Sequence, residues 1–279
     1  MAVWVNNAGI GTVGEFTETP LEAHVQVVKT NLLGYMNGCF AVLPYFKKQG
    51  SGTIINLNSL GAFVPLPFAS GYSASKFGLL GFMEALRGEL AADKNIHVCD
   101  IYPVSVNTPG YRHAGNYVGA LLKPIPPMID SETVAETVLD VVRSPRAQTT
   151  LGWPSAFARI GYALFPGLTR NLVGQMFREY FKIALPSPHT EGTIFESKRE
   201  TGRTSGSPAA SGAVFAKASH QNHKSELTTP LLVGAAGLAV GLGIFLALRQ
   251  SKSSASKPLE KHADYPLYQR MQGSQIARG

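Results

Sequence analysis

The stretch "GTIINLNSLGAFVPLPFASGYSASK", residues 52–76, contains the two elements that decide the fold. Its first part, "GTIINLNS", is a run rich in β-branched residues bounded by glycine and asparagine, which is typical of a buried strand. From about Ser70 the apolar residues take up helical spacing, and they keep it to about residue 93. The stretch therefore predicts a buried strand followed by a helix.

Strands and helices also alternate on both sides of this stretch. The apolar run at residues 2–6 has the composition of a buried strand, and a long helix follows it from about Pro20. The next strand is "IHVCDIYP" at residues 96–103, a helix spans residues 131–143, and "QTTLGW" at residues 148–153 supplies a short last strand. This alternation favours an α/β, doubly wound, Rossmann-like parallel sheet, with ligands at the carboxyl ends of the strands.

Two further segments complete a domain that we place at residues 1–185. Residues 104–130 are rich in proline and glycine and too long for a simple connection, so we expect a loop that covers the substrate. Residues 153–185 mix apolar, aromatic and basic side chains, and we expect helices that pack beside this loop. Cys39 and Cys99 both lie in apolar contexts, which indicates neither a disulfide framework nor a metal site.

The rest of the chain has the composition of a membrane anchor. Residues 186–226 are rich in Ser, Gly, Thr, Lys and Pro, which predicts a flexible linker. Residues 227–248 carry no charge and, as a helix, would match the ~30 Å of a bilayer core. Residues 249–279 form a basic polar tail. We expect a single-pass membrane protein with its catalytic domain on the cytoplasmic side, although a glycine-rich apolar helix docked on the domain is an alternative.

The charge of the chain favours lipid over nucleic acid as a partner. The formal net charge is +7 and the pI is about 9.4. Many basic residues fall in residues 159–203 and 217–278, around the apolar segment, a pattern that favours anionic membrane lipid. The sequence has no zinc-finger spacing and no basic recognition helix, so nucleic acid is not expected.

One glycine-rich motif resembles a phosphate-binding loop but has the wrong context. "GIGTVG", residues 9–14, matches G-x-G-x-x-G and follows a strand. In a dinucleotide-binding fingerprint a helix opens within the motif, and an acidic residue follows a second strand about 20 residues later. Here the helix begins only near Pro20, so we interpret the motif as a turn.

Three polar side chains form a candidate catalytic group. Tyr72 and Lys76 lie one helical turn apart on the same face, where an ammonium favours phenolate and lowers a pKa that is otherwise near 10. Ser59 follows the preceding strand, where its hydroxyl can donate to a substrate carbonyl or simply end the strand. Asn31 lies within a helix despite its low propensity, which indicates either solvent exposure or a site that holds water.

These residues belong to an ordered series of motifs. In chain order they are "NNAG" at residues 6–9, Asn31, "INLNSLGA" with Ser59, "YSASK" with Tyr72 and Lys76, and "YPVSVNTP" at residues 102–109. The series resembles the short-chain dehydrogenase/reductase family over about residues 2–151, and the 13-residue spacing from Ser59 to Tyr72 also matches that family.

The resemblance implies an NAD- or NADP-dependent enzyme that interconverts a small-molecule alcohol and a carbonyl. It implies that Tyr72 transfers the proton, that Lys76 lowers the pKa of Tyr72 and holds the nicotinamide ribose, and that Ser59 positions the carbonyl. Asn31 would hold a relay water, and Thr108 would contact the nicotinamide amide. The family pattern uses no metal.

The resemblance also assigns Asn6, Ala8 and Gly9 to the cofactor site, where they would line the cofactor and brace the sheet. The sequence departs from the family at Val104, where glycine usually follows the proline, and at its start. The family opens with a strand and a Thr-Gly-x-x-x-Gly-x-Gly turn, so we expect that the first three strands are lacking, as in a fragment. Residues 2–6 would then expose an apolar sheet edge.

Two functions fit these features. The first is a membrane-anchored NAD(P)-dependent oxidoreductase for a lipophilic substrate, as a monomer or a homo-oligomer. The alternative is a non-catalytic membrane-anchored interaction protein that has lost its cofactor-binding half. An in-frame strand and glycine turn encoded upstream of Met1 would support the first function, and an in-frame stop would support the second.

Overall fold

The computed structural model describes residues 2–124, 128–152 and 154–196. One four-stranded sheet forms the centre of this part of the chain, and all neighbouring strands run parallel. The strand order is β1–β3–β4–β8, formed by Val3–Asn6, Gly52–Leu57, Ile96–Pro103 and Gln148–Leu151. The predicted α/β parallel sheet is therefore confirmed.

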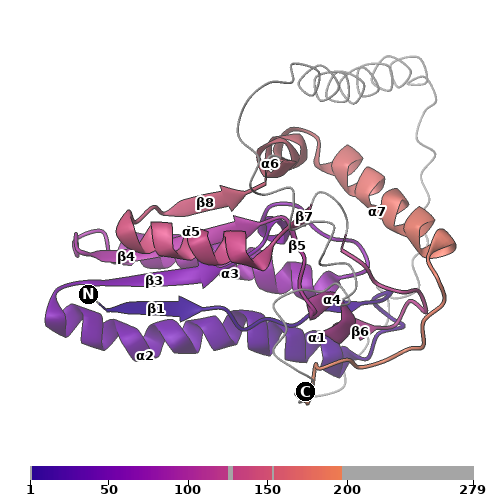
Figure 1. Ribbon diagram of the computed structural model, residues 1–279, viewed down its shortest axis with the longest axis horizontal. Coiled ribbons are helices and arrows are strands. Elements are labelled where there is room, and N and C mark those ends of the chain that lie inside the picture. The colour runs from indigo at the N-terminus through magenta and orange to yellow at the C-terminus, as the bar shows by residue number, and fades with distance from the viewer. Residues whose placement is uncertain (1, 125–127, 153, 197–279) are drawn as a thin grey trace, which may run out of the picture. The chain divides into compact units, whose positions relative to one another are not determined.

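Helices cover both faces of this sheet (Figure 1). α2 (Gly34–Gln49) and α3 (Ser70–Glu89) cover one face, and α5 (Ser131–Arg143) covers the other. Ile54 of β3 belongs to the apolar cluster under α2 and α3, whereas its neighbour Ile55 belongs to the cluster under α5. Successive strand residues point to opposite faces, so β3 is buried on both sides, as its β-branched composition predicts.

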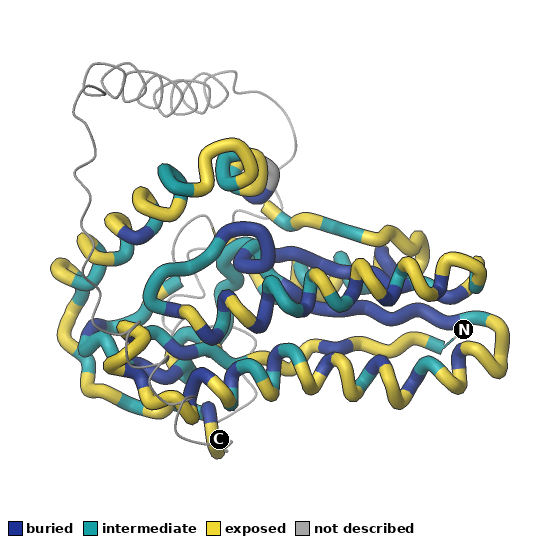
Figure 2. The backbone as a smooth tube through the Cα atoms, turned by 180° about the vertical axis from the view of Figure 1, so that it is seen from behind, coloured by how far each residue is buried: buried dark blue, intermediate teal, exposed yellow. Residues whose placement is uncertain are grey.

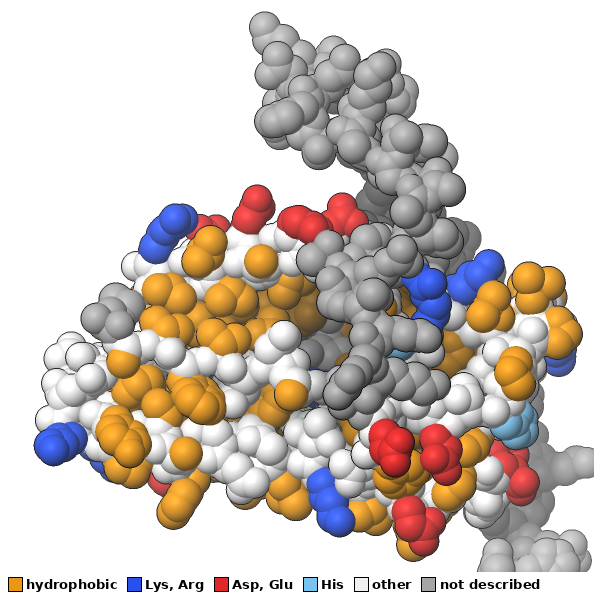
Figure 3. Space-filling view, turned by 60° about the horizontal axis from the view of Figure 1, so that its bottom comes forward, with side chains coloured by type: hydrophobic (Ala, Val, Ile, Leu, Met, Phe, Trp, Pro, Cys, Tyr) orange, Lys and Arg blue, Asp and Glu red, His pale blue; other side chains and the backbone are white. Residues whose placement is uncertain are grey.

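The first strand lies at an exposed edge. Among the described residues β1 pairs only with β3, and Val3, Trp4 and Val5 are 37–42% exposed. Figure 2 shows the contrast between exposed β1 and buried β3, and many hydrophobic side chains are visible on the face drawn in Figure 3. The expected apolar edge is present, so apolar composition here does not mean burial.

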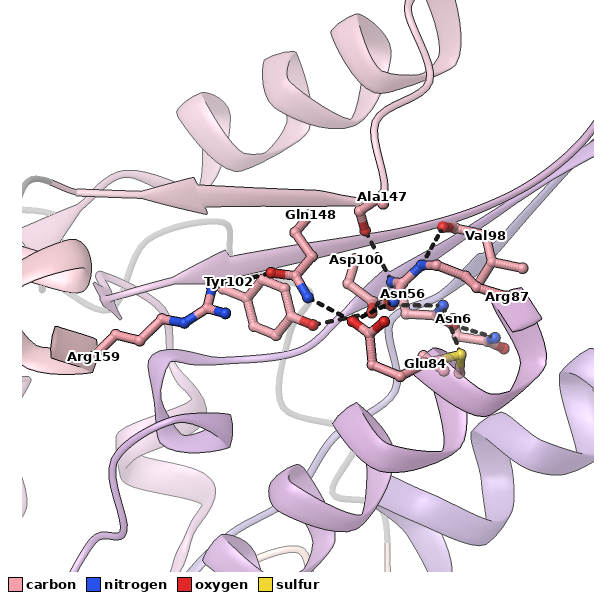
Figure 4. Close-up of polar contacts among 11 residues, drawn as sticks. Asn6, Asn56, Glu84, Arg87, Val98, Asp100, Tyr102, Ala147, Gln148 and Arg159 are labelled. Carbon is pink, nitrogen blue, oxygen red and sulfur yellow. Dashed lines mark hydrogen bonds and ion pairs between the residues drawn. The ribbon is translucent and has the colours of Figure 1, made fainter. Parts of the chain in front are cut away.

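A row of polar side chains crosses the sheet from strand to strand (Figure 4). Asn6, Asn56 and Asp100 are register partners on β1, β3 and β4. The Asn6 amide donates to Asn56 Oδ1 at 2.8 Å, and the Asn56 amide donates to Asp100 Oδ1 at 3.0 Å. Asp100 is fully buried and accepts hydrogen bonds from Arg87 of α3 and, at 3.0 Å, from the Tyr102 hydroxyl. The row ties the strands together below the carboxyl ends of the sheet.

The predicted substrate loop contains short elements of its own. Within residues 104–130 the structure forms one helical turn and three short strands: β5 pairs with β7 inside the loop, and β6 pairs with β2, which lies near the start of the chain. These elements are β2 (Thr12–Val13), β5 (Ser105–Val106), α4 (Gly110–His113), β6 (Gly115–Asn116) and β7 (Met128–Ile129).

The first part of the expected linker, residues 186–196, is paired with other described residues. Residues 186–196 return to the substrate loop, with isolated antiparallel bridges from Pro186 to Ala120 and from Thr190 to Asn116. Ile194 is 3% exposed and lies under Gly115. Backbone pairing and one buried apolar side chain therefore fix a segment whose Ser, Thr and Pro content predicted a linker.

The C-terminal helices lie where they are expected, as α6 (Pro154–Leu164) and α7 (Pro166–Ile183). None of the helices in the described ranges has the length and apolar character that a membrane crossing requires. The predicted span at residues 227–248, the tail at 249–279 and the linker beyond residue 196 lie outside the described residues.

Candidate active site

The candidate catalytic side chains meet at the carboxyl end of β3. Ser59 lies two residues beyond β3 and forms the N-cap of a short 3-10 turn, η2 (Leu60–Ala62). Tyr72 lies in the first turn of α3, and Lys76 follows one turn later. A strand end followed by a helix start thus brings these three residues together, as their spacing predicts.

Tyr72 and Ser59 lie on either side of Gly61, where an added β-carbon would be 3.2 Å from Tyr72 Cε1 and 3.4 Å from Ser59 Oγ. The Gly61 backbone N–H donates to Ser59 Oγ at 3.0 Å, which leaves the Ser59 hydroxyl hydrogen free for another acceptor. Burial raises the pKa of Tyr72; the Ser59 hydroxyl acts in the opposite direction, and nearby Tyr111 adds to the rise. The expected net lowering of the Tyr72 pKa is therefore wrong for the protein alone, because desolvation outweighs the lowering by Ser59.

Lys76 is a buried cation, with only 4% of its surface exposed. Its Nζ donates to the Leu57 carbonyl at 3.1 Å and lies 5.8 Å from the centre of the Tyr72 ring. Burial lowers the pKa of Lys76 to about 8, and the charge of Asp100 opposes that fall. At neutral pH most of the amine is therefore still protonated.

Asn31 connects the loop after β1 to α3. It lies in a π-helical turn, η1 (Lys29–Leu33), which joins α1 (Leu21–Val28) to α2. Its amide accepts from Ile10 N at 2.9 Å, donates to Ile10 O at 2.8 Å, and donates to Ser75 Oγ at 3.2 Å. Burial with three protein partners, rather than solvent exposure, thus accounts for an asparagine in this helix. Its role in holding a relay water stays a prediction.

The residues assigned to cofactor binding are divided between the sheet and two loops. Asn6 accepts from Trp4 Nε1 at 2.7 Å and belongs to the polar row of the sheet. Ala8 and Gly9 lie in the exposed loop after β1. The Thr108 backbone N–H donates to Val106 O at 2.9 Å, within the turn after β5. Their contacts with a cofactor stay predictions.

The glycine motif at residues 9–14 forms a turn and a short strand. It contains β2, and α1 begins only at Leu21, so no helix opens inside the motif. A β-carbon at Gly14 would overlap Thr19 Oγ1 and lie 2.8 Å from Tyr117 Cβ. Close packing therefore accounts for glycine at this position without a phosphate.

Sequence reasoning missed three aromatic residues around the site. Tyr35 of α2 donates its hydroxyl hydrogen to the Leu57 carbonyl at 3.0 Å. Tyr111 lies near Tyr72 and shares a 2.8 Å hydrogen bond with Ser105. Phe68, which precedes α3, has a φ of 65°, a left-handed conformation that is uncommon outside glycine and often marks functional sites. None of the three belongs to a local motif, so tertiary structure alone reveals them.

The donors at this site fit the reacting end of a nicotinamide cofactor. A hydroxyl, a phenol and an ammonium converge there, and a β-carbon at Gly11 would lie 3.8 Å from the Tyr72 ring, so the loop passes close to the phenol. Asn58, which precedes Ser59, is 5% exposed, and neither polar atom of its amide has a partner among the described residues. A buried amide without a partner is a candidate to bind a ligand or water.

Comparison with known protein families supports this description. Residues 1–116 match the family model for short chain dehydrogenases. The 3-ketodihydrosphingosine reductase of Bacteroides thetaiotaomicron is 42% identical over 109 residues, which cover 39% of this chain and 40% of that protein. An uncharacterized oxidoreductase of Bacillus subtilis, YxnA, is 30% identical over 199 residues, which cover 70% of this chain and 56% of that protein. The chain thus spans about half the length of these curated relatives.

Solved structures show the same fold. A short chain dehydrogenase from Burkholderia cenocepacia, in complex with NADP, has a TM-score of 0.53 and 25% identity, over 62% of this chain and 68% of that one. A short-chain dehydrogenase from Streptomyces avermitilis has a TM-score of 0.51 and 22% identity, over 64% of this chain and 71% of that one. The family match, the parallel sheet and the side chains at its edge agree that residues 1–116 are similar to the short-chain dehydrogenase family.

Proposed function

We propose that this chain carries the catalytic part of an NAD(P)-dependent oxidoreductase that interconverts a carbonyl and an alcohol. The observation that carries the proposal is that the Tyr72 and Ser59 side chains flank Gly61 together, with the Lys76 ammonium 5.8 Å from the centre of the phenol ring. These groups lie at the carboxyl end of β3, where parallel sheets bind their ligands.

The protein side of the reaction follows from these contacts. The Ser59 hydroxyl donates a hydrogen bond to the substrate carbonyl and orients it. The raised pKa of Tyr72 keeps its phenol protonated at neutral pH, so the phenol can give its proton to the oxygen as negative charge develops there. The Lys76 ammonium stabilises the phenolate that remains. The nicotinamide supplies or accepts the hydride.

We propose NAD or NADP as the cofactor, held at its ribose by Tyr72 and Lys76 and at its amide by Thr108. The donor set of the site supports this assignment, as does the Burkholderia cenocepacia structure, which is a complex with NADP. A protonated phenol favours carbonyl reduction at neutral pH, because reduction needs a proton donor and oxidation needs a base.

We further propose a lipophilic substrate and attachment to a membrane. Phe68 packs edge-on against Phe181 of α7 at 5.2 Å between ring centres, and Phe177 lies 5.9 Å from Phe181, so aromatic side chains gather beside the start of α3. A relative named for a long-chain ketone also supports this choice. The uncharged segment at residues 227–248 would provide the anchor and keep the enzyme near lipid.

Oxidation of NADPH by the full chain, followed by absorbance, tests the proposal with 3-ketodihydrosphingosine and with short ketones. We expect Tyr72→Phe to lower turnover by about 10²–10⁴-fold while NADPH affinity stays within about twofold. Tyr45→Phe, at an exposed position of α2, is the matched control and should leave turnover unchanged. The measurements are repeated on a chain extended by any in-frame codons upstream of Met1.

Unchanged turnover in Tyr72→Phe would refute the catalytic assignment. The alternative of a non-catalytic interaction protein gains no support from the comparisons. It would return only if both chains failed to bind NADPH and to reduce every ketone tested.

A further inference from the structure

Two buried side chains on different helices donate to one backbone oxygen. The Leu57 carbonyl, at the end of β3, accepts from Lys76 Nζ at 3.1 Å and from the Tyr35 hydroxyl at 3.0 Å. Tyr35 is 2% exposed and Lys76 is 4% exposed, so water competes little for either bond. A carbonyl oxygen has two lone pairs, and here both donors are protein groups.

The same two side chains also meet directly. Lys76 Nζ lies over the Tyr35 ring, 5.5 Å from its centre, and over the Tyr72 ring, 5.8 Å from its centre. Both distances are within the range in which a cation is attracted to the face of an aromatic ring. The ammonium therefore lies between two ring faces and one carbonyl.

The π-helical turn accounts for the position of Tyr35. Asn31 and Tyr35 are four residues apart, and the turn η1 ends at Leu33, two residues before Tyr35. Both side chains are buried; Asn31 reaches the loop after β1, and Tyr35 reaches the end of β3. An inserted π turn often marks a functional site, because it changes which side chains face inward.

We propose that Tyr35 is a positioning residue for Lys76, in which the ring holds the ammonium against the Leu57 carbonyl so that the charge stays beside Tyr72. Tyr35 is not a catalytic residue, because its hydroxyl hydrogen is used by Leu57. Burial raises the pKa of Tyr35, so it remains a neutral donor at every pH at which the amine titrates. The effect of Tyr35 on catalysis rests on the proposed function, whereas its contacts with Lys76 and Leu57 do not depend on that proposal.

A purely structural role for Tyr35 makes a different prediction. Tyr35 also belongs to the apolar cluster under α2 and α3, and a core residue of that kind would change stability without changing the titration of Lys76. A positioning residue contributes to the stability of the charged amine. Loss of the ring face should therefore lower the pKa of Lys76 below its present value of about 8.

The test is an NMR titration of the full chain with lysine labelled at Cε, in which the Lys76 signal is identified by its absence from Lys76→Met. Tyr35→Met, which retains bulk but no ring, should lower the Lys76 midpoint by ~0.4–1.5 pH units. Tyr35→Phe, which retains the ring, should keep the midpoint within about 0.3 pH units of the wild type. Tyr45→Met, at an exposed position of the same helix, is the matched control and should change nothing.

An unchanged or raised midpoint in Tyr35→Met would overturn the proposal, as would an equal fall in Tyr35→Phe. If Tyr35→Met does not fold, the wild-type spectrum decides: Lys76 Hε protons over two rings should lie upfield of those of exposed lysines, and normal shifts would overturn the proposal. Because the readout is one amine and not turnover, a protein that reduces no ketone could still show the predicted shift. Failure of this proposal is thus distinguishable from failure of the proposed function.

Discussion

The buried amine of Lys76 gives a prediction that links function to stability. Burial lowers the pKa of Lys76 from 10.5 to about 8. The difference is about 2.5 pH units, and at about 1.4 kcal/mol for each unit the charged amine costs the folded state roughly 3.5 kcal/mol at pH 7. Lys76→Met removes that cost, and the Leu57 carbonyl keeps its bond from Tyr35. We expect the free energy of unfolding of Lys76→Met to be about 1–3 kcal/mol higher than that of the wild type.

The predicted difference in stability between Lys76→Met and the wild type depends on pH. The unfolded chain holds the Lys76 proton up to about pH 10.5, whereas the folded chain releases it near pH 8. Between these values the unfolded state binds more protons, so the stability of the wild type rises with pH through this residue. The Met variant has no such rise, and its advantage over the wild type should largely disappear by pH 10.5.

Urea denaturation of both proteins at pH 7 and pH 10 measures these free energies. Lys48→Met, at an exposed position of α2, is the control and should change stability by no more than about 0.5 kcal/mol at either pH. A Met variant less stable than the wild type at pH 7, or an advantage that does not shrink at pH 10, would refute the reasoning.

Two further predictions concern the sheet and its polar row. Gly38→Ala should lower the free energy of unfolding by about 1–3 kcal/mol, because a β-carbon there would overlap Asn6 Oδ1. Gly81 of α3 has open space around it, so Gly81→Ala should raise the free energy of unfolding by about 0.5–1 kcal/mol. Urea denaturation compares the pair, and equal effects would contradict the close packing of α2 on β1. Arg87→Met should cost about 3–5 kcal/mol at pH 7, because it leaves the Asp100 carboxylate buried without its cation. This loss of unfolding free energy should shrink as the pH falls and Asp100 takes up a proton. A loss that grows in acid would contradict the assignment of Arg87 as the partner of the Asp100 carboxylate.

Local patterns predicted the part of the site that depends on local structure. A β-branched run, a change to helical spacing and a four-residue interval are enough to place Ser59, Tyr72 and Lys76 near one another. The alternation of such units also predicted the parallel sheet. These features depend on short-range geometry, which the order of residues determines directly.

Features that depend on tertiary structure were not predictable in this way. The polar row needs the register of β1, β3 and β4, and the place of Tyr35 needs a π turn that composition does not reveal. The direction of the Tyr72 pKa depends on how deeply the phenol is buried, which the Tyr-x-x-x-Lys spacing does not report. Residues 186–196 were assigned to a linker because composition cannot show which backbone groups will pair.

The most direct test of the central claim follows the hydride and the proton donor together. The protein is incubated with NADPH deuterated at both C4 positions and with a lipophilic ketone. We predict that deuterium appears on the carbinol carbon of the product, and that Tyr72→Phe binds the labelled cofactor but forms almost none of that product. Product without deuterium, or equal labelling by the wild type and Tyr72→Phe, would contradict the account.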